Sequence, residues 1–139
     1  MFILDTNVVS ELRKSKSGKS NVHVLDWAAQ VDDASLFLSS ITILELELGT
    51  LLMERRDPIQ GANLRAWLEG QVLPAFATRV LPIDIAVSRR CASLHIPNPR
   101  SYRDSLIAAT ALVNGMTVVT RNVSDFAGTG VNLVNPWLP

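Results

Sequence analysis

The chain has 139 residues, which is enough for one domain with a hydrophobic core and too few for two domains of ordinary size. Hydrophobic residues make up 47% and charged residues 19%, a composition that excludes an intrinsically disordered chain. Thirteen basic and thirteen acidic side chains give no net charge, so any phosphate-binding surface must be local. We expect a single domain over residues 1–139, apolar enough to form an interface with a partner or a second copy.

Cellular location is constrained by three features of the sequence. Cys91 is the only cysteine, which excludes an internal disulfide and a multi-cysteine zinc site and fits a reducing compartment. The apolar N-terminal run is interrupted at Asp5 and its cations follow it, unlike a secretion signal. No stretch approaches the roughly 18 uninterrupted apolar residues of a membrane span. We therefore expect a cytoplasmic protein that does not contact membranes.

Five short apolar segments predict β-strands, and longer segments with helical periodicity lie between them. The predicted strands are 2–4, 36–38, 80–81, 117–120 and 131–134. The predicted helices are 8–12, 22–29, 41–49 continuing toward residue 54, 59–76, 85–94 and 101–112. Strands that alternate with helices form βαβ units, which are right-handed in nearly all proteins. The pattern predicts an α/β fold with a mainly parallel five-stranded sheet.

The helix that begins near Ile41 has two features of its own. Thr42 and Glu45 have the spacing of a capping box. At about 100° per residue, four leucines share one face, which we expect to be buried and to lie nearer to Glu45 than to Glu47. These are Leu44, Leu48, Leu51 and Leu52.

Four carboxylates follow predicted strands directly or lie in the first turn of the next helix: Asp5, Glu45, Asp104 and Asp125. Parallel strands collect ligands outside their carboxyl ends, so this placement makes the four residues candidates for one site. Each also has a purely structural interpretation. Asp5 suits an N-cap, Glu45 and Asp104 suit capping boxes, and Asp125 suits a turn.

Carboxylates that converge cannot all stay ionised unaided, because two unit charges about 4 Å apart repel by roughly 4 kcal/mol at an effective dielectric of 20. A hard divalent cation such as Mg²⁺ or Mn²⁺ relieves this repulsion and prefers oxygen ligands. His23 and His95 occupy unrelated positions, and we interpret His95 as a helix C-cap. The motifs of serine hydrolases, zinc proteases and P-loop enzymes are absent. An all-oxygen acidic site therefore suggests phosphodiester chemistry.

Basic residues gather in the polar segment 13–20. Arg13, Lys14 and Lys16 are either part of a solvated edge or contacts for a phosphate backbone. Arg121 follows the fourth predicted strand and is a further candidate for contacting a phosphate backbone.

Five segments, taken in order, resemble the PIN-domain family, in particular the VapC-type ribonuclease toxins and most closely their FitB branch. They are ILDTNVVSE at 3–11, SSITILELELG at 39–49, DSLIAATA at 104–111, TRN at 120–122 with Asp125 and Phe126, and NPW at 135–137. The resemblance implies a three-layer α/β/α sandwich, a Mg²⁺ or Mn²⁺ ion and hydrolysis of RNA. It also implies a homodimer and a small antitoxin partner of the VapB type that binds DNA and silences the toxin.

The resemblance also assigns roles to individual positions. Asp5, Glu45 and Asp104 match the core acidic positions, with Asp5 and Asp104 expected to hold the metal. Asp125 matches the fourth and most variable acidic position, and with Glu45 it would complete the metal shell or accept a proton from the attacking water.

Two supporting residues and one residue outside the motif complete this assignment. Asn7 and Thr120 match positions that orient the acidic residues or the attacking water. Arg103 lies outside the motif and is expected either to pair with a site carboxylate or to meet the substrate.

Two rival functions remain at this point. The chain could be a non-catalytic module that binds RNA or a protein partner and keeps the acidic site only in part. A phosphoacceptor of the haloacid-dehalogenase kind also begins with an apolar strand ending in Asp, but it needs a second Asp two residues later, where this chain has Asn7.

Overall fold

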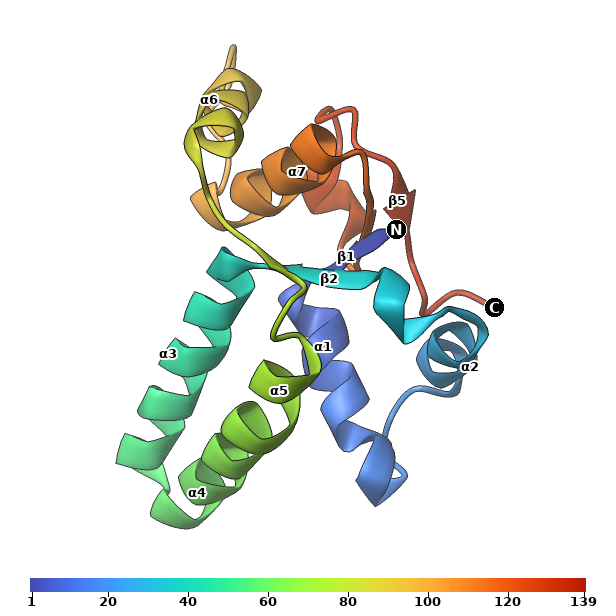
Figure 1. The fold of residues 1–139 in the computed structure, drawn as a ribbon, viewed down its shortest axis with the longest axis vertical. Helices are drawn as coiled ribbons and strands as arrows, with labels where there is room; N and C mark the ends of the chain where they lie inside the picture. Colours follow the sequence, from blue (N-terminus) through green and yellow to red (C-terminus); the bar gives the residue numbers. More distant parts are fainter.

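A parallel five-stranded sheet forms the centre of the protein in a computed structural model that describes residues 1–139 (Figure 1). The strands are β1 (Phe2–Leu4), β2 (Leu36–Ser39), β3 (Val80–Leu81), β4 (Thr117–Val119) and β5 (Leu133–Val134). Their spatial order is β3-β2-β1-β4-β5, and all four neighbouring pairs are parallel. All five predicted strands are confirmed, although the last begins two residues later than expected.

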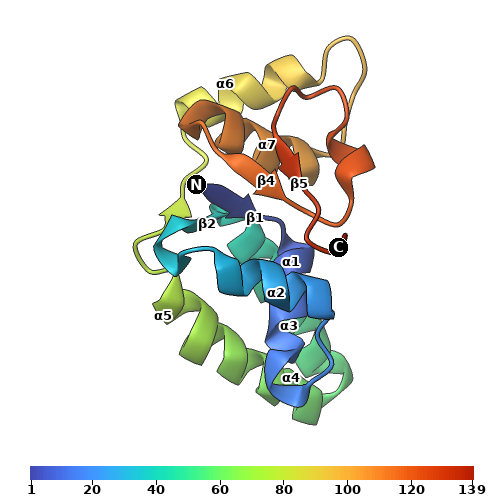
Figure 2. The same ribbon diagram turned by 90° about the vertical axis from the view of Figure 1, so that its right-hand side faces the viewer.

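Helices cover both faces of this sheet, which confirms the three-layer sandwich (Figures 1 and 2). One face carries α1 (Thr6–Arg13), α2 (Val22–Gln30), α3 (Ser40–Arg56), α4 (Pro58–Trp67) and α5 (Leu73–Ala75), and a π-helical stretch, Leu68–Val72, joins α4 to α5. The other face carries α6 (Ile85–Leu94) and α7 (Tyr102–Asn114). None of these helices has the combination of length and apolar character that a membrane span requires.

The strand order reverses direction between β1 and β4. From β1 the chain moves outward through β2 to β3, and it then returns to place β4 and β5 on the other side of β1. Such a reversal leaves a crevice outside the carboxyl ends of the two central strands. Asp5 directly follows β1 and Thr120 directly follows β4, so both residues lie at this crevice.

Short strands with apolar side chains on both faces explain the central position of β1 and β4. Ile3 and Leu4 are both fully buried, yet they belong to two hydrophobic clusters on opposite faces of the sheet. Val118 and Val119 divide in the same way. On the α7 side, the small residues Ala108, Ala109 and Ala111 are fully buried, as expected for a helix that lies close to the sheet.

The start of α3 differs from the sequence prediction. The helix begins at Ser40, and Ser39 is its N-cap, with its hydroxyl accepting a 3.3 Å hydrogen bond from the Ile41 N–H. Thr42 is fully buried inside the helix, so the predicted capping box of Thr42 and Glu45 does not form. Because β2 ends at Ser39 and α3 begins at the next residue, the free backbone N–H groups at the start of α3 lie nearer to Ser39 than the spacing of Thr42 and Glu45 predicted.

The leucine face of α3 also contradicts the prediction. Leu44, Leu48, Leu51 and Leu52 are between 49% and 60% exposed. The buried face of α3 carries Thr42, Leu46 and Thr50 instead, spaced four residues apart. Periodicity shows which residues share a face, but only the position of α3 against its neighbours decides which face is covered.

A close crossing of α3 and α4 forms the base of the helical layer. An added Cβ atom at Gly61 in α4 would collide with the backbone Cα of Glu54 in α3. The guanidinium of Arg65 reinforces the pair through ion pairs with Glu47 at 2.7 Å and Glu54 at 2.9 Å. Only glycine allows the two helices to approach so closely at this point.

We predict that Gly61→Ala destabilises the fold by about 1–3 kcal/mol, because the methyl group forces the two backbones apart. Gly49→Ala is the matched control, since nothing lies within 4 Å of the added methyl and the exposed helix position should gain about 0.5–1 kcal/mol. Urea unfolding followed by circular dichroism measures both. Equal stabilities of the two variants would contradict the close crossing.

Candidate active site

Asp5 lies at the junction between β1 and α1. Its Oδ1 atom accepts a 2.7 Å hydrogen bond from the Thr6 backbone N–H and so caps the helix. Its Oδ2 atom accepts hydrogen bonds from the Thr120 hydroxyl at 2.8 Å and from the Asn7 amide at 3.3 Å. Asp5 is only 6% exposed. The residue therefore acts as an N-cap and also presents a fixed carboxylate at the crevice.

Thr120 and Asn7 hold Asp5 from two different segments. The Thr120 Oγ1 atom accepts a 3.0 Å hydrogen bond from the Asn122 N–H, which leaves its hydroxyl hydrogen for Asp5. The Asn7 side-chain carbonyl accepts from the Arg121 N–H at 3.4 Å, so the end of β4 is tied to α1. The structure thus places both predicted supporting residues beside Asp5. Their contribution to a reaction stays a prediction.

Glu45 reaches the same region from the second turn of α3. Its side chain is only 12% exposed. The leucine face, which we expected to be buried close to Glu45, is instead open to solvent. Oε1 accepts a 2.9 Å hydrogen bond from the Thr6 hydroxyl, and Oε2 forms a 2.9 Å ion pair with Nε of Arg103. Arg103 therefore pairs with a site carboxylate, which is one of the two outcomes expected for it.

Asp104 and Asp125 approach from the opposite helical layer and from the loop after β4. Asp104 lies in the first turn of α7, where its backbone N–H donates to the N-cap hydroxyl of Ser101 at 3.5 Å. Asp125 lies in a short 3-10 segment, Val123–Phe126, that follows β4. The Ser101 cap confirms half of the predicted capping box, while the Asp104 carboxylate lines a cavity.

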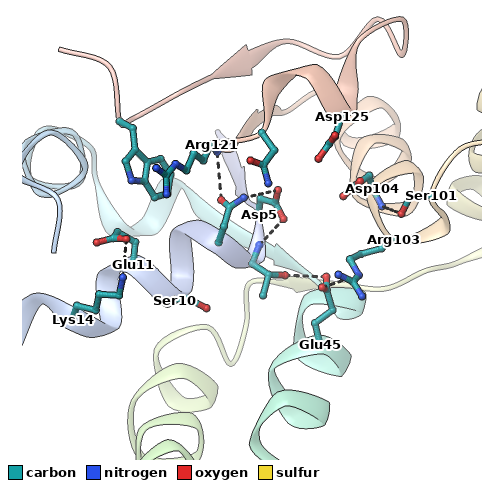
Figure 3. A pocket seen from close by; sticks show the side chains of 14 residues that line it. Asp5, Ser10, Glu11, Lys14, Glu45, Ser101, Arg103, Asp104, Arg121 and Asp125 are labelled. Carbon is teal, nitrogen blue, oxygen red and sulfur yellow. Dashed lines mark hydrogen bonds and ion pairs between the residues drawn. The ribbon is translucent and has the colours of Figure 1, made fainter. Parts of the chain in front are cut away.

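One open cavity of about 510 Å³ brings these residues together (Figure 3). All four predicted carboxylates contribute to its wall, and only one of its fourteen lining residues is hydrophobic. The lining residues are Asp5, Thr6, Asn7, Ser10, Glu11, Lys14, Glu45, Ser101, Arg103, Asp104, Arg121, Asn122, Asp125 and Trp137. The structure therefore collects at one sheet edge acidic residues that lie up to 120 positions apart (from Asp5 to Asp125) in the chain.

The sequence assigns roles to Asn7 and Lys14 among these residues, but none to Ser10, Glu11 and Trp137. Asn7, Ser10, Glu11 and Lys14 have the spacing of one helical face, and this polar stripe of α1 forms one wall of the cavity. Trp137 comes from the far end of the chain and supplies the one hydrophobic side chain. The stripe was detectable as a helical period, whereas nothing local marks Trp137 as a cavity residue.

Comparison with known proteins agrees with this arrangement. The sequence model of the PIN domain matches residues 2–130. This chain is a PIN-domain protein. It is 41% identical to a VapC ribonuclease of Sinorhizobium fredii, covering 100% of this chain and 99% of the relative. It is 35% identical to the toxin FitB of Neisseria gonorrhoeae, covering 99% of each chain.

Solved structures extend the similarity to three dimensions. The crystal structure of FitAcB from Neisseria gonorrhoeae matches with a TM-score of 0.89 at 33% identity, and the match covers 100% of both chains. The structure of FitAB bound to an IR36 DNA fragment matches with a TM-score of 0.88 at the same identity. The family membership predicted from five sequence segments is thereby confirmed.

The basic residues predicted to contact RNA divide into two groups in this PIN domain. Lys14 and Arg121 line the cavity. Arg13 lies instead over the ring of Trp67, 5.7 Å from its centroid, and borders a separate apolar hollow. Lys16 is exposed in the 3-10 segment Lys14–Ser17 and does not line the cavity. The structure thus supports a place at the site for only two of the four candidates.

Burial and mutual repulsion make the cavity unfavourable for negative charge. Burial is the main cause that raises the pKa of Asp5, Glu45 and Asp104 above their ordinary values. Neighbouring carboxylates raise the pKa values further, with Asp5 and Asp125 acting on Asp104. The guanidinium of Arg103 opposes these effects and lowers the pKa of all three residues. The site therefore favours a proton or a cation among its carboxylates.

Glu11, on the α1 wall, has the opposite electrostatic environment. Its Oε2 atom accepts a 2.9 Å hydrogen bond from the Asn21 N–H, and Oε1 lies 3.2 Å from Nζ of Lys14. These contacts, led by the Asn21 hydrogen bond, lower the pKa of Glu11. Glu11 thus joins α1 to the start of α2 as a stable carboxylate.

Asp104 and Glu11 should respond oppositely to neutralisation. Asp104 has a raised pKa in the folded state, so its charge destabilises the fold above that pKa, and this cost disappears as the pH falls through it. Glu11 has a lowered pKa, so its stabilisation is present above its unfolded pKa and is lost as the pH falls through its folded pKa.

We therefore predict that, at pH 7.5 in EDTA, Asp104→Asn raises the free energy of unfolding and Glu11→Gln lowers it. Both differences should shrink as the pH falls toward 3. Denaturant titrations over this pH range measure the effects. A destabilised Asp104→Asn protein at pH 7.5 would contradict the electrostatic account of the cavity.

Proposed function

We propose that this PIN-domain protein is a metal-dependent endoribonuclease and the toxin of a type II toxin–antitoxin pair. The observation that carries the proposal is the convergence of Asp5, Glu45, Asp104 and Asp125 on one polar cavity at the strand-order reversal. Support comes from full-length similarity to a VapC ribonuclease and to the toxin FitB. The proposed substrate is RNA, and the reaction is hydrolysis of a phosphodiester bond.

The donor atoms of the cavity fit a hard divalent cation such as Mg²⁺ or Mn²⁺. All candidate ligands are carboxylate oxygens, and burial and mutual repulsion make their uncompensated negative charges unfavourable. No three acidic, histidine or cysteine side chains are close enough together to ligate one ion. This arrangement suits Mg²⁺, which accepts one or two carboxylates and completes its shell with water and substrate phosphate oxygens.

In the proposed mechanism, Asp5 and Asp104 would hold the cation from opposite helical layers. The chemistry that a divalent ion would supply there is polarisation of the scissile phosphate and stabilisation of the charge that develops on it. Thr120 and Asn7 keep the Asp5 carboxylate in one orientation through their hydrogen bonds. Glu45 and Asp125 complete the acidic shell or accept the proton of the attacking water. A raised pKa suits Glu45 for holding that proton.

We predict that Asp5→Asn lowers the rate of RNA cleavage at least about 100-fold, since a neutral amide is a weaker ligand than a carboxylate and does not balance the charge of the cation. The fold should persist, because Asn is an equally good N-cap and keeps an acceptor for the Thr6 N–H. Cleavage of a labelled RNA with Mg²⁺, Mn²⁺ or excess EDTA measures the effect. Undiminished cleavage by folded Asp5→Asn protein would refute the assignment, and RNA binding without any cleavage would favour the non-catalytic module.

We further propose two protein partners, a second copy of the chain and a small DNA-binding antitoxin of the VapB type. The similarity to FitAB bound to a DNA fragment supports a partner of the second kind, because that complex is seen on DNA. The exposed leucines of α3 support a self-interface, because a contiguous apolar face of this kind marks an interaction site. Intracellular RNA as substrate and a free, buried Cys91 are consistent with the expected cytoplasmic location.

We predict that Leu48→Glu converts a dimer to a monomer, because it places a charge in the centre of the leucine face. Ile85→Glu is the control, as Ile85 is 80% exposed at the start of α6, in the other helical layer. Light scattering coupled to size-exclusion chromatography gives the mass of each variant. If Leu48→Glu stays dimeric but loses antitoxin binding, the leucine face is the antitoxin surface instead.

A further inference from the structure

The cavity has two chemically different ends. Glu45, Arg103 and Asp104 lie on one side of Asp5, and Glu11, Lys14 and Arg121 lie on the other (Figure 3). The second end also contains Trp137, whose ring lies under the guanidinium of Arg121 at 5.4 Å from centroid to Cζ. The metal-binding chemistry proposed above uses only the acidic end and leaves this aromatic and basic end without a role.

Hydrogen bonds to the backbones of Arg121 and Trp137 hold both residues in place. The side chain of Asn135 accepts a 3.0 Å hydrogen bond from the Trp137 N–H and donates to the Arg121 carbonyl at 3.5 Å. The Arg121 N–H donates to Asn7, a residue that also contacts Asp5. Trp137 packs against the hydrophobic cluster on the α1 side of the sheet. The position of this pair is therefore fixed relative to the carboxylates.

Arg121 is also the one cation of the cavity that forms no ion pair. Lys14 pairs with Glu11 at 3.2 Å, and Arg103 pairs with Glu45 at 2.9 Å. The guanidinium of Arg121 lies over the indole ring instead, and the residue is exposed. A planar cation on an aromatic ring, open to a cavity, has its charge and its flat surface available to a ligand.

We infer that Arg121 and Trp137 form a nucleobase-binding subsite that stacks one unpaired base of single-stranded RNA beside the cleavage site, with the positive charge of Arg121 close to the adjacent phosphate. Guanidinium planes and aromatic rings are the surfaces on which unstacked RNA bases lie. A base inside an A-form duplex is covered on both faces and cannot reach such a pair. This inference rests on the proposed ribonuclease function and adds the side chains that hold one base of the substrate.

Binding can be measured without cleavage by using a fluorescein-labelled, non-self-complementary RNA of eight nucleotides in EDTA. We expect Arg121→Gln to weaken binding about tenfold and to lower the salt slope, d log K/d log[salt], by about 0.7, the value for one phosphate-neutralising charge on a single strand. Arg121→Lys should keep the salt slope but still bind several-fold more weakly, since it keeps the charge and loses the plane. Trp137→Leu should weaken binding about tenfold through lost stacking.

The chain supplies a matched control in Arg13, which lies over Trp67 in the same way but outside the cavity. Arg13→Gln should bind the octamer within about twofold of the unmodified protein, because it removes one charge outside the RNA path. The octamer annealed to its complement should compete at least about tenfold more weakly than the single strand, because its bases are already stacked.

The inference is overturned if Arg121→Gln binds like the unmodified protein, if Arg13→Gln loses as much affinity, or if the duplex competes equally well. Should Trp137→Leu fail to fold, the Arg121 variants and the duplex competition decide the result alone. Failure of the proposed function is distinguishable, because it would remove metal-dependent cleavage while leaving the Arg121 dependence of binding in EDTA intact.

Discussion

The Asp5 carboxylate is fixed by donors from two neighbouring strand ends, and the rest of the site depends on that arrangement. The parallel register pairs Leu4 with Val119, which sets Asp5 beside Thr120. A slip of one residue would turn these side chains to opposite faces of the sheet. The same junction positions Thr6, whose hydroxyl binds Glu45. Through this chain of contacts, the pairing of β1 with β4 orients groups from α1, α3 and the loop after β4.

Stability and function make opposite demands on this cavity. Its carboxylates have pKa values raised by burial and by one another, so the protein keeps charges where an uncharged core would be more stable. Arg103 relieves part of the repulsion from within the chain. The contrast with Glu11 is informative, because its carboxylate is satisfied by a backbone N–H and a lysine and adds to stability. Carboxylates whose mutual repulsion is only partly compensated are suited to hold a cation.

A chain without net charge nevertheless creates strong local differences. The acidic end of the cavity faces an end with an unpaired arginine on an aromatic ring, and the exposed leucines of α3 lie nearby. A second hollow lined by Glu45, Arg103, Leu44, Leu48 and Leu52 connects these features. The proposed substrate site and the proposed partner surface therefore share a boundary at Glu45 and Arg103. A partner on the leucine face would contact residues that belong to the site itself.

Local chemistry determined the strands, most helix ends and the acidic candidates, because short apolar runs, helical periodicity and capping by residues such as Ser101 act over a few residues. The resemblance to the PIN-domain family predicted that the four carboxylates, although far apart in the chain, belong to one site. The tertiary structure alone decided that the α3 leucines face solvent, that Ser39 replaces Thr42 as the cap, and that Arg103 pairs with Glu45. It also placed Lys14 and Arg121 at the cavity and Arg13 and Lys16 away from it. These outcomes depend on which helix face meets which neighbour, a choice made by packing between segments far apart in the chain.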